Sequence, residues 1–357
     1  MIPFEEKFTK IDTFLESNRR PNFNNILKVL KREIPDRYTL FEFFLNKDLY
    51  NSLTYKNTYD EKDRDINAKK TIDAYKNAGY DYATIIGSEF EFHSSRLEKQ
   101  GKLESINLND GAIIFDRESF ESYAWPDADA CDYSVLDRLA GYLPDGMKFI
   151  IWGEGGVLEN VTKLLGFENM CLMSYDDPEL LQDVFNKVGS GFVKYYLNCA
   201  KYDSVGALIS NDDWGFNSQT MLSLEGMRRY VIPWHKKIVE VIHAAEKPAI
   251  LHSCGKLDTV MDDIIDYIGY EGKHSYEDKI LPVEKAYDKY SSRISILGGL
   301  DLDFICRSSP KEVYNRAVAM LEKAHDKGGY ALGSGNSIPH YVPQENYLAM
   351  IAAAIFN

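Results

Sequence analysis

The sequence predicts an α/β fold, a TIM (β/α)8 barrel preceded by a helical N-terminal extension. Two observations predict this fold. Short apolar runs alternate with longer segments of helical period, and polar residues gather where those runs end. A chain of 357 residues fits one domain of this kind. We therefore expect a single domain over 1–357, with a helical cap at 1–78 and the barrel at 79–357.

The expected elements follow in order along the chain. The first 78 residues are polar, and residues 26–33 have helical spacing that stops before Pro35. Strands are expected at 82–87, 112–115, 148–152, 205–211, 248–252, 270–274, 294–298 and 330–333. Helices are expected between most of them, at 178–200, 224–245, 257–268, 283–290 and 310–327. Right-handed crossovers would close eight such strands into a barrel. An open doubly wound sheet is the alternative, but no G-x-G-x-x-G follows the first strand.

Composition excludes several function classes. The chain is 45% hydrophobic and 27% charged, which is typical of a globular protein. A net charge of -14 argues against nonspecific nucleic-acid binding and against an anionic membrane surface. We find no apolar run of about 18 residues, the length that spans a bilayer, and no secretory signal. Five widely spaced cysteines are typical of reduced thiols, so we expect a cytoplasmic protein.

The segment Leu251-His252-Ser253-Cys254-Gly255 ends an expected strand. Residues i and i+2 of a strand share a face, so His252 and Cys254 converge at the strand's C-terminal end. Barrel enzymes place their chemistry at this end. Imidazole and thiol are good zinc ligands, although a catalytic site needs three protein ligands and the motif supplies two. A satisfied core pair is the alternative.

Carboxylates follow other expected strands. Asp212 and Asp213 come directly after an apolar run, where two adjacent carboxylates are costly unless they are solvated, paired or metal-bound. We expect them, with Glu277, to carry acid–base catalysis, and a helix cap with a salt bridge is the alternative for the aspartates. Further polar residues at strand ends are expected to contact substrate: Trp214, Glu154, His274, Asp301 and Ser334. A helix N-cap is an equal alternative for Asp301.

Several motifs together resemble the uroporphyrinogen decarboxylase superfamily, on the side of its zinc-dependent, corrinoid-linked methyltransferases. They are residues 25–37, Asp212-Asp213-Trp214-Gly215, His252-Ser253-Cys254-Gly255, residues 297–301, Ser337-Ile338-Pro339 and Pro343-Gln344-Glu345-Asn346. The resemblance implies a TIM barrel. The decarboxylases carry an arginine-rich N-terminal loop, where this chain has Arg37 followed by Tyr38-Thr39-Leu40. Porphyrinogen decarboxylation is therefore disfavoured, because a polyanion needs several fixed cations.

In the methyltransferases the histidine and cysteine of H-x-C-G bind zinc, which implies that role for His252 and Cys254. Their second zinc-binding cysteine lies in the loop after the last strand, a position that falls on or near Ser334. Serine is a poor zinc ligand beside a thiolate. Either a carboxylate such as Glu277, Glu154 or Asp212 completes the zinc sphere, or the site binds metal weakly.

The resemblance implies a corrinoid-dependent methyltransferase. Such an enzyme moves a methyl group between a small methylated substrate and a cobalamin-binding partner protein, with zinc as Lewis acid. An aromatic methyl ether, and hence O-demethylation, is one candidate for the substrate. A homodimer is compatible with the family. Two alternatives stay open: a metal-free, decarboxylase-like enzyme acting on a small acid, and a barrel that binds a corrinoid or tetrapyrrole without turnover.

Overall fold

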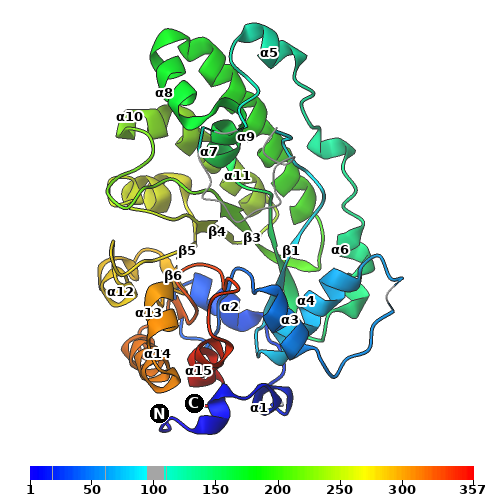
Figure 1. The fold of residues 1–357 in the computed structure, drawn as a ribbon, viewed down its shortest axis with the longest axis vertical. Coiled ribbons are helices and arrows are strands. Elements are labelled where there is room, and N and C mark those ends of the chain that lie inside the picture. Colours follow the sequence, from blue (N-terminus) through cyan, green and yellow to red (C-terminus); the bar gives the residue numbers. More distant parts are fainter. Residues whose placement is uncertain (18, 61, 95–107, 110) are drawn as a thin grey trace.

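The computed structural model describes residues 1–17, 19–60, 62–94, 108–109 and 111–357. Its centre is a curled sheet of seven parallel strands, and each strand pairs with the next one along the chain (Figure 1). Parallel neighbours need crossover connections, and helices provide most of them. The strands are β1 Tyr82–Ile86, β2 Lys148–Trp152, β3 Val205–Asn211, β4 Ala249–His252, β5 Gly272–His274, β6 Ser295–Leu297 and β7 Tyr330–Ala331.

The expected strands are confirmed at seven positions, and the expected strand at 112–115 is wrong. Residues 111–115 form no strand. The backbone amides of Ile113 and Ile114 both donate to the carbonyl oxygen of Leu164, at 2.9 and 3.1 Å. This short apolar run therefore satisfies its backbone at the end of a helix instead of in the sheet, a choice that periodicity cannot reveal.

A segment near the N-terminus lies along the free edge of β7. Leu40 forms a parallel bridge with Leu332. The Phe41 amide donates to the Leu332 carbonyl at 2.7 Å, and the Leu332 amide donates to the Thr39 carbonyl at 2.8 Å. On the other side, the Thr84 hydroxyl of β1 donates to the Phe43 carbonyl at 2.6 Å. This segment, which we expected to belong to the helical cap, therefore fills the place between β7 and β1.

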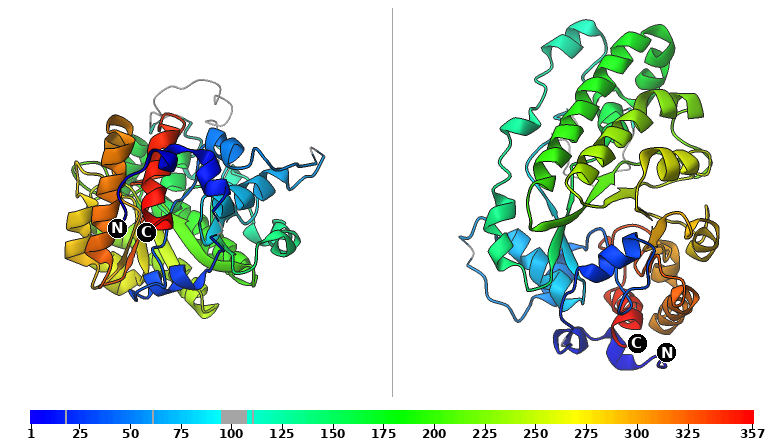
Figure 2. Two further views of the ribbon diagram at one scale, coloured as in Figure 1. Left: turned by 90° about the horizontal axis from the view of Figure 1, so that it is seen from below. Right: turned by 180° about the vertical axis from the view of Figure 1, so that it is seen from behind.

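The helices pack around the sheet, as the views in Figure 2 show, and the two chain ends lie side by side. The helix expected at 178–200 is confirmed, and it begins at Pro178 because the Asp177 side chain accepts the Leu180 amide at 3.0 Å. No helix of the described residues is long and apolar enough to cross a membrane. The α-helices are α1 Ile11–Leu15, α2 Asn24–Leu30, α3 Lys47–Leu53, α4 Ile66–Asn77, α5 Arg117–Ser122, α6 Val135–Arg138, α7 Val157–Leu165, α8 Phe167–Asp176, α9 Pro178–Ala200, α10 Leu224–Gly226, α11 Ile232–Ala244, α12 Val283–Tyr290, α13 Leu302–Arg307, α14 Pro310–Ala324 and α15 Gln344–Ile355.

Candidate metal centre

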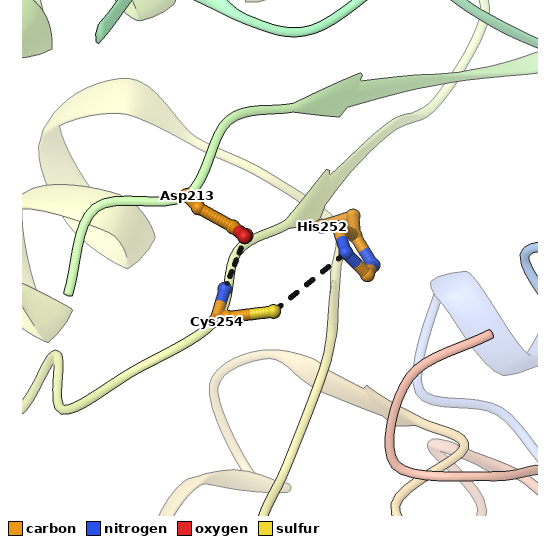
Figure 3. A group of neighbouring side chains, drawn as sticks. All are labelled: Asp213, His252 and Cys254. Atoms are coloured by element: carbon orange, nitrogen blue, oxygen red, sulfur yellow. Dashed lines mark hydrogen bonds between the residues drawn. The ribbon is translucent and has the colours of Figure 1, made fainter. Parts of the chain in front are cut away.

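Three potential metal ligands meet at the C-terminal ends of β3 and β4 (Figure 3). His252 is the last residue of β4, Cys254 lies two residues further on, and Asp213 lies in the loop after β3. One ligand atom from each side chain lies within 4.8 Å of the others. The distance between His252 Nε2 and Cys254 Sγ is 4.0 Å. The structure therefore brings the predicted pair together and adds a carboxylate to it.

Backbone contacts between the two loops hold this arrangement. The Cys254 amide donates to Asp213 Oδ1 at 2.8 Å, and the Lys256 amide donates to the Phe216 carbonyl at 2.9 Å. Gly255 has φ +89°, and a Cβ on it would lie 2.2 Å from the carbonyl of Gly215. Only glycine tolerates both this conformation and this approach. The H-x-C-G motif thus includes the residue that lets the loops touch.

The Cys254 thiol is enclosed by donors. Ser275 Oγ and Asn336 Nδ2 each lie 3.3 Å from Cys254 Sγ. Burial, followed by the nearby Asp213 carboxylate, raises the pKa of the Cys254 thiol well above its ordinary value. Ser275 adopts φ +81°, a strained backbone for a residue with a side chain, and such strain gathers at functional sites. A metal cation bound at the centre would lower the pKa of this thiol and displace its proton.

A buried lysine lies beside the three ligands. The Lys273 ammonium donates to the carbonyls of Ser253, His274 and Ser275 at 3.2, 3.3 and 2.7 Å. Burial lowers its pKa to about 8, while the charges of Cys254 and Asp213 oppose that shift. Sequence reasoning missed Lys273. The signal was present, since a charged residue inside the short strand Gly272–His274 requires buried partners.

The predicted substrate residue His274 lies behind His252 and is fully buried. The two Nδ1 atoms are 2.8 Å apart, and His274 Nε2 lies 3.2 Å from the Ser334 carbonyl oxygen. Burial lowers the pKa of both imidazoles, that of His274 to about 3. Both rings are therefore neutral at physiological pH, which is the state that binds metal.

Ser334, the position expected to replace the family's second cysteine, is turned away from the three ligands. Its hydroxyl donates to Glu42 Oε1 at 2.7 Å and its amide donates to Glu42 Oε2 at 3.1 Å. Our candidates for the third ligand need correction, because Glu277, Glu154 and Asp212 join no such group within the described part of the chain. Asp213 is the carboxylate that lies together with His252 and Cys254. Ser334 and Glu42 lie too far apart in sequence for their contact to be predicted.

The pH dependence of stability is expected to report on Glu42. Burial raises the pKa of Glu42 to about 8, so the folded protein keeps a proton that the unfolded chain releases near pH 4.5. The free energy of unfolding attributable to Glu42 therefore falls as pH rises from about 5 to about 8. In Glu42→Gln this slope is expected to be smaller than in the wild type, as measured by urea unfolding at several pH values. Parallel curves for the two proteins would contradict the assignment.

Asp212 and Trp214 lie away from the three ligands. Asp212 is fully buried, and its carboxylate accepts from Leu158 N, Glu159 N, His235 Nε2 and Trp214 Nε1, each at 2.9 Å. It therefore caps helix α7 and anchors two side chains, which corrects the expectation that it acts in catalysis. Trp214 is fully buried as well, so the expectation that it contacts substrate is also corrected.

Asp301 and Glu277 lie near the centre in different environments. Asp301 caps α13 by accepting the Phe304 amide at 3.1 Å, and it accepts the Asp278 amide at 2.8 Å, as its alternative interpretation predicted. Glu277 lines a small cavity together with Lys273 and Ser275. Burial, followed by the charge of Asp301, raises its pKa. Glu277 thus shares a cavity with the lysine that lies beside the three ligands.

Glu154 lines a separate, larger pocket together with Phe44 and Trp152. Phe43 connects this pocket to the centre, because its ring centroid lies 4.6 Å from that of His252 and 5.3 Å from that of Trp152. Burial raises the pKa of Glu154. Aromatic rings thus lie between the three ligands and a pocket large enough for a small molecule.

Comparison with known families identifies the chain. The model of the family "Uroporphyrinogen decarboxylase (URO-D)" matches residues 149–355, which is more than half of the sequence. The protein belongs to the URO-D family. No curated protein matches it.

A solved structure agrees with the fold of this URO-D protein. A methyltransferase from Methanosarcina mazei is similar over 92% of this chain and 97% of its own, with 15% sequence identity and a TM-score of 0.63. A structure titled "Putative Vitamin-B12 Independent Methionine Synthase" from Listeria monocytogenes covers 90% of this chain and 98% of its own, with 13% identity and a TM-score of 0.48. At 15% identity the likeness to the M. mazei protein concerns the fold alone.

Proposed function

We propose that this URO-D protein is a metal-dependent methyltransferase whose zinc ion is bound by His252, Cys254 and Asp213. The observation that carries the proposal is the convergence of these three side chains at the end of two neighbouring strands. Their nitrogen, sulfur and oxygen donors suit zinc. Their ligand atoms lie within 4.8 Å of one another, so small side-chain movements would bring them to zinc bonds of about 2.0–2.3 Å. Three protein ligands leave an open coordination position, as catalytic zinc sites do.

Bound zinc would supply a Lewis acid for the methylated heteroatom, or for an acceptor thiol. The chain's own residues prepare the site. Lys273 places a positive charge beside the Cys254 sulfur and the Asp213 carboxylate, which favours their anionic, metal-binding forms. Ser275 and Asn336 point donors at the same sulfur and hold its position.

The surroundings suggest how substrate is handled. Phe43, Phe44 and Trp152 offer an apolar, aromatic surface beside His252, which suits a methylated and weakly polar molecule such as an aromatic methyl ether. Glu277, whose pKa is raised by burial, would give a proton to a departing oxygen or nitrogen. Glu154 would contact the part of the substrate that extends into the larger pocket.

The methyl group would pass to or from cobalt in a corrinoid carried by a partner protein. The resemblance of the H-x-C-G motif to the corrinoid-linked methyltransferases supports this choice, and a protein of the same fold is itself a methyltransferase. The M. mazei protein is too distant to indicate a substrate, so the substrate must come from experiment.

Metal content and methyl transfer test the proposal together. Protein purified with zinc and then dialysed is expected to retain one zinc per chain by mass spectrometry. With a reduced corrinoid protein and a panel of methoxylated aromatics and methylamines, a methylcobalt absorption spectrum is expected to appear. Protein that binds no metal but releases carbon dioxide from a small acid would overturn the proposal in favour of the decarboxylase alternative.

A further inference from the structure

Two imidazoles are hydrogen-bonded to each other directly behind the proposed centre. His252 and His274 are register partners at the ends of β4 and β5, so both rings project from the same face of the sheet. Their Nδ1 atoms lie 2.8 Å apart, a distance that requires a hydrogen atom between them. One ring donates and the other accepts.

The far side of His274 decides which ring donates. His274 Nε2 lies 3.2 Å from the carbonyl oxygen of Ser334, and a carbonyl oxygen only accepts. His274 Nε2 therefore carries a hydrogen. A neutral imidazole has one N–H group, so Nδ1 of His274 is the acceptor and Nδ1 of His252 is the donor. The lone pair of His252 is then left on Nε2, the atom that lies 4.0 Å from Cys254 Sγ.

We propose that His274 is a positioning residue that fixes His252 in the tautomer whose free Nε2 faces Cys254 and Asp213. This inference rests on the metal centre proposed above and adds a role that its three ligands do not supply. A histidine ligand commonly donates its second nitrogen to an acceptor that orients the ring. Here the acceptor is another imidazole, which a backbone carbonyl orients in turn.

The chain is built around this contact. Glu42 accepts two hydrogen bonds from Ser334, one from the Ser334 amide and one from the Ser334 hydroxyl. These bonds fix the direction of the Ser334 carbonyl. Gly298 adopts φ +65°, and a Cβ there would lie 2.3 Å from the Ser334 oxygen and 2.9 Å from His274 Nε2. Glycine at 298 thus makes the room for the contact. Ser334 contributes through its carbonyl and leaves the metal side to Asp213.

The charges around the rings keep His274 neutral. Within the described residues, no carboxylate forms an ion pair with His252 or His274. A carboxylate oxygen of Asp213 lies within 4.8 Å of the His252 ring, and the Lys273 ammonium lies beside His274, donating to its backbone carbonyl at 3.3 Å. A cation next to a buried imidazole disfavours imidazolium. With His274 neutral, the arrangement has only one consistent set of protons.

The tautomer can be read without metal or substrate. In metal-free protein labelled with nitrogen-15, the spectrum is expected to show a protonated Nδ1 and a bare Nε2 for His252. In His274→Leu the acceptor is lost, and His252 is expected to show a mixture of tautomers. A hydrogen on His252 Nε2 in the wild type would overturn the proposal. The expected tautomer in a protein that binds no metal would support it and contradict only the proposed function.

Metal affinity provides the second measurement. Because partners of metal-ligating histidines contribute 10–100-fold to affinity, His274→Leu is expected to bind zinc about 10–100-fold more weakly than wild type. His274→Gln keeps an acceptor for His252 and a donor for Ser334, and it is expected to restore most of the affinity. The exposed His340 provides a matched control, and His340→Leu is expected to bind zinc as wild type does. Equal affinity in wild type and His274→Leu, or no recovery in a folded His274→Gln, would overturn the role.

Discussion

Replacing Cys254 with serine is expected to lower zinc affinity by more than about 100-fold. This loss is larger than the roughly 10–100-fold expected for a residue that only orients a metal ligand. The thiolate is the softest ligand of the three, and a serine hydroxyl remains protonated where a thiol bound to zinc does not. Serine has nearly the same shape and can still accept from Ser275 and Asn336, so the fold is expected to survive. Competition titration with a zinc chelator measures the change.

Other cysteines provide the control for this prediction. Cys171 in α8 and Cys306 in α13 are partly buried and belong to no group of potential metal ligands in the described part of the chain. Cys171→Ser and Cys306→Ser are therefore expected to bind zinc as the wild type does. Cobalt(II) adds a spectroscopic test, since the absorption of a cobalt–thiolate bond is expected in both control proteins and absent in Cys254→Ser. Retention of that absorption in Cys254→Ser would mean that the metal binds elsewhere.

The sheet was predictable where a buried parallel strand produces an apolar run in the sequence. The run Ala249–His252 is such a case, and so is Val205–Asn211. The prediction failed where a contact between distant segments decides the structure. Leu40 joins the edge of β7 because Leu332 offers its backbone, and residues 112–115 leave the sheet because Leu164 accepts their amides. No local pattern carries this information.

The part of the site that local strand geometry determines was predictable as well. His252 and Cys254 lie two residues apart on one strand end, so local geometry alone brings them together. Glu42, Ser334 and Gly298 come from three distant segments, and only the folded structure shows that they support His274. Asp212 and Asp213 show the limit most clearly. They are neighbours of one type, and the fold turns one toward helix α7 and the other toward Cys254.

Replacing these two aspartates is expected to change different properties: stability for Asp212 and zinc affinity for Asp213. Asp212→Ala leaves the Trp214 indole, the His235 imidazole and two amides of α7 without their acceptor inside a dry core. Removing one partner of a buried, charged network costs about 3–5 kcal/mol, so the free energy of unfolding is expected to fall by that amount. Asp213→Asn is its matched control. It lies in the same loop, keeps an oxygen for the Cys254 amide, and is expected to change stability by less than about 1 kcal/mol.

Measured together, unfolding and zinc binding separate the two roles. Urea unfolding followed by circular dichroism gives the free energy, and chelator competition gives the zinc affinity. Asp213→Asn is expected to fold normally and to bind zinc weakly, because a neutral amide oxygen replaces a charged ligand. Asp212→Ala, in conditions where it remains folded, is expected to keep all three ligands and hence its metal. If Asp213→Asn instead keeps its zinc and a folded Asp212→Ala loses it, Asp212 would be the metal ligand.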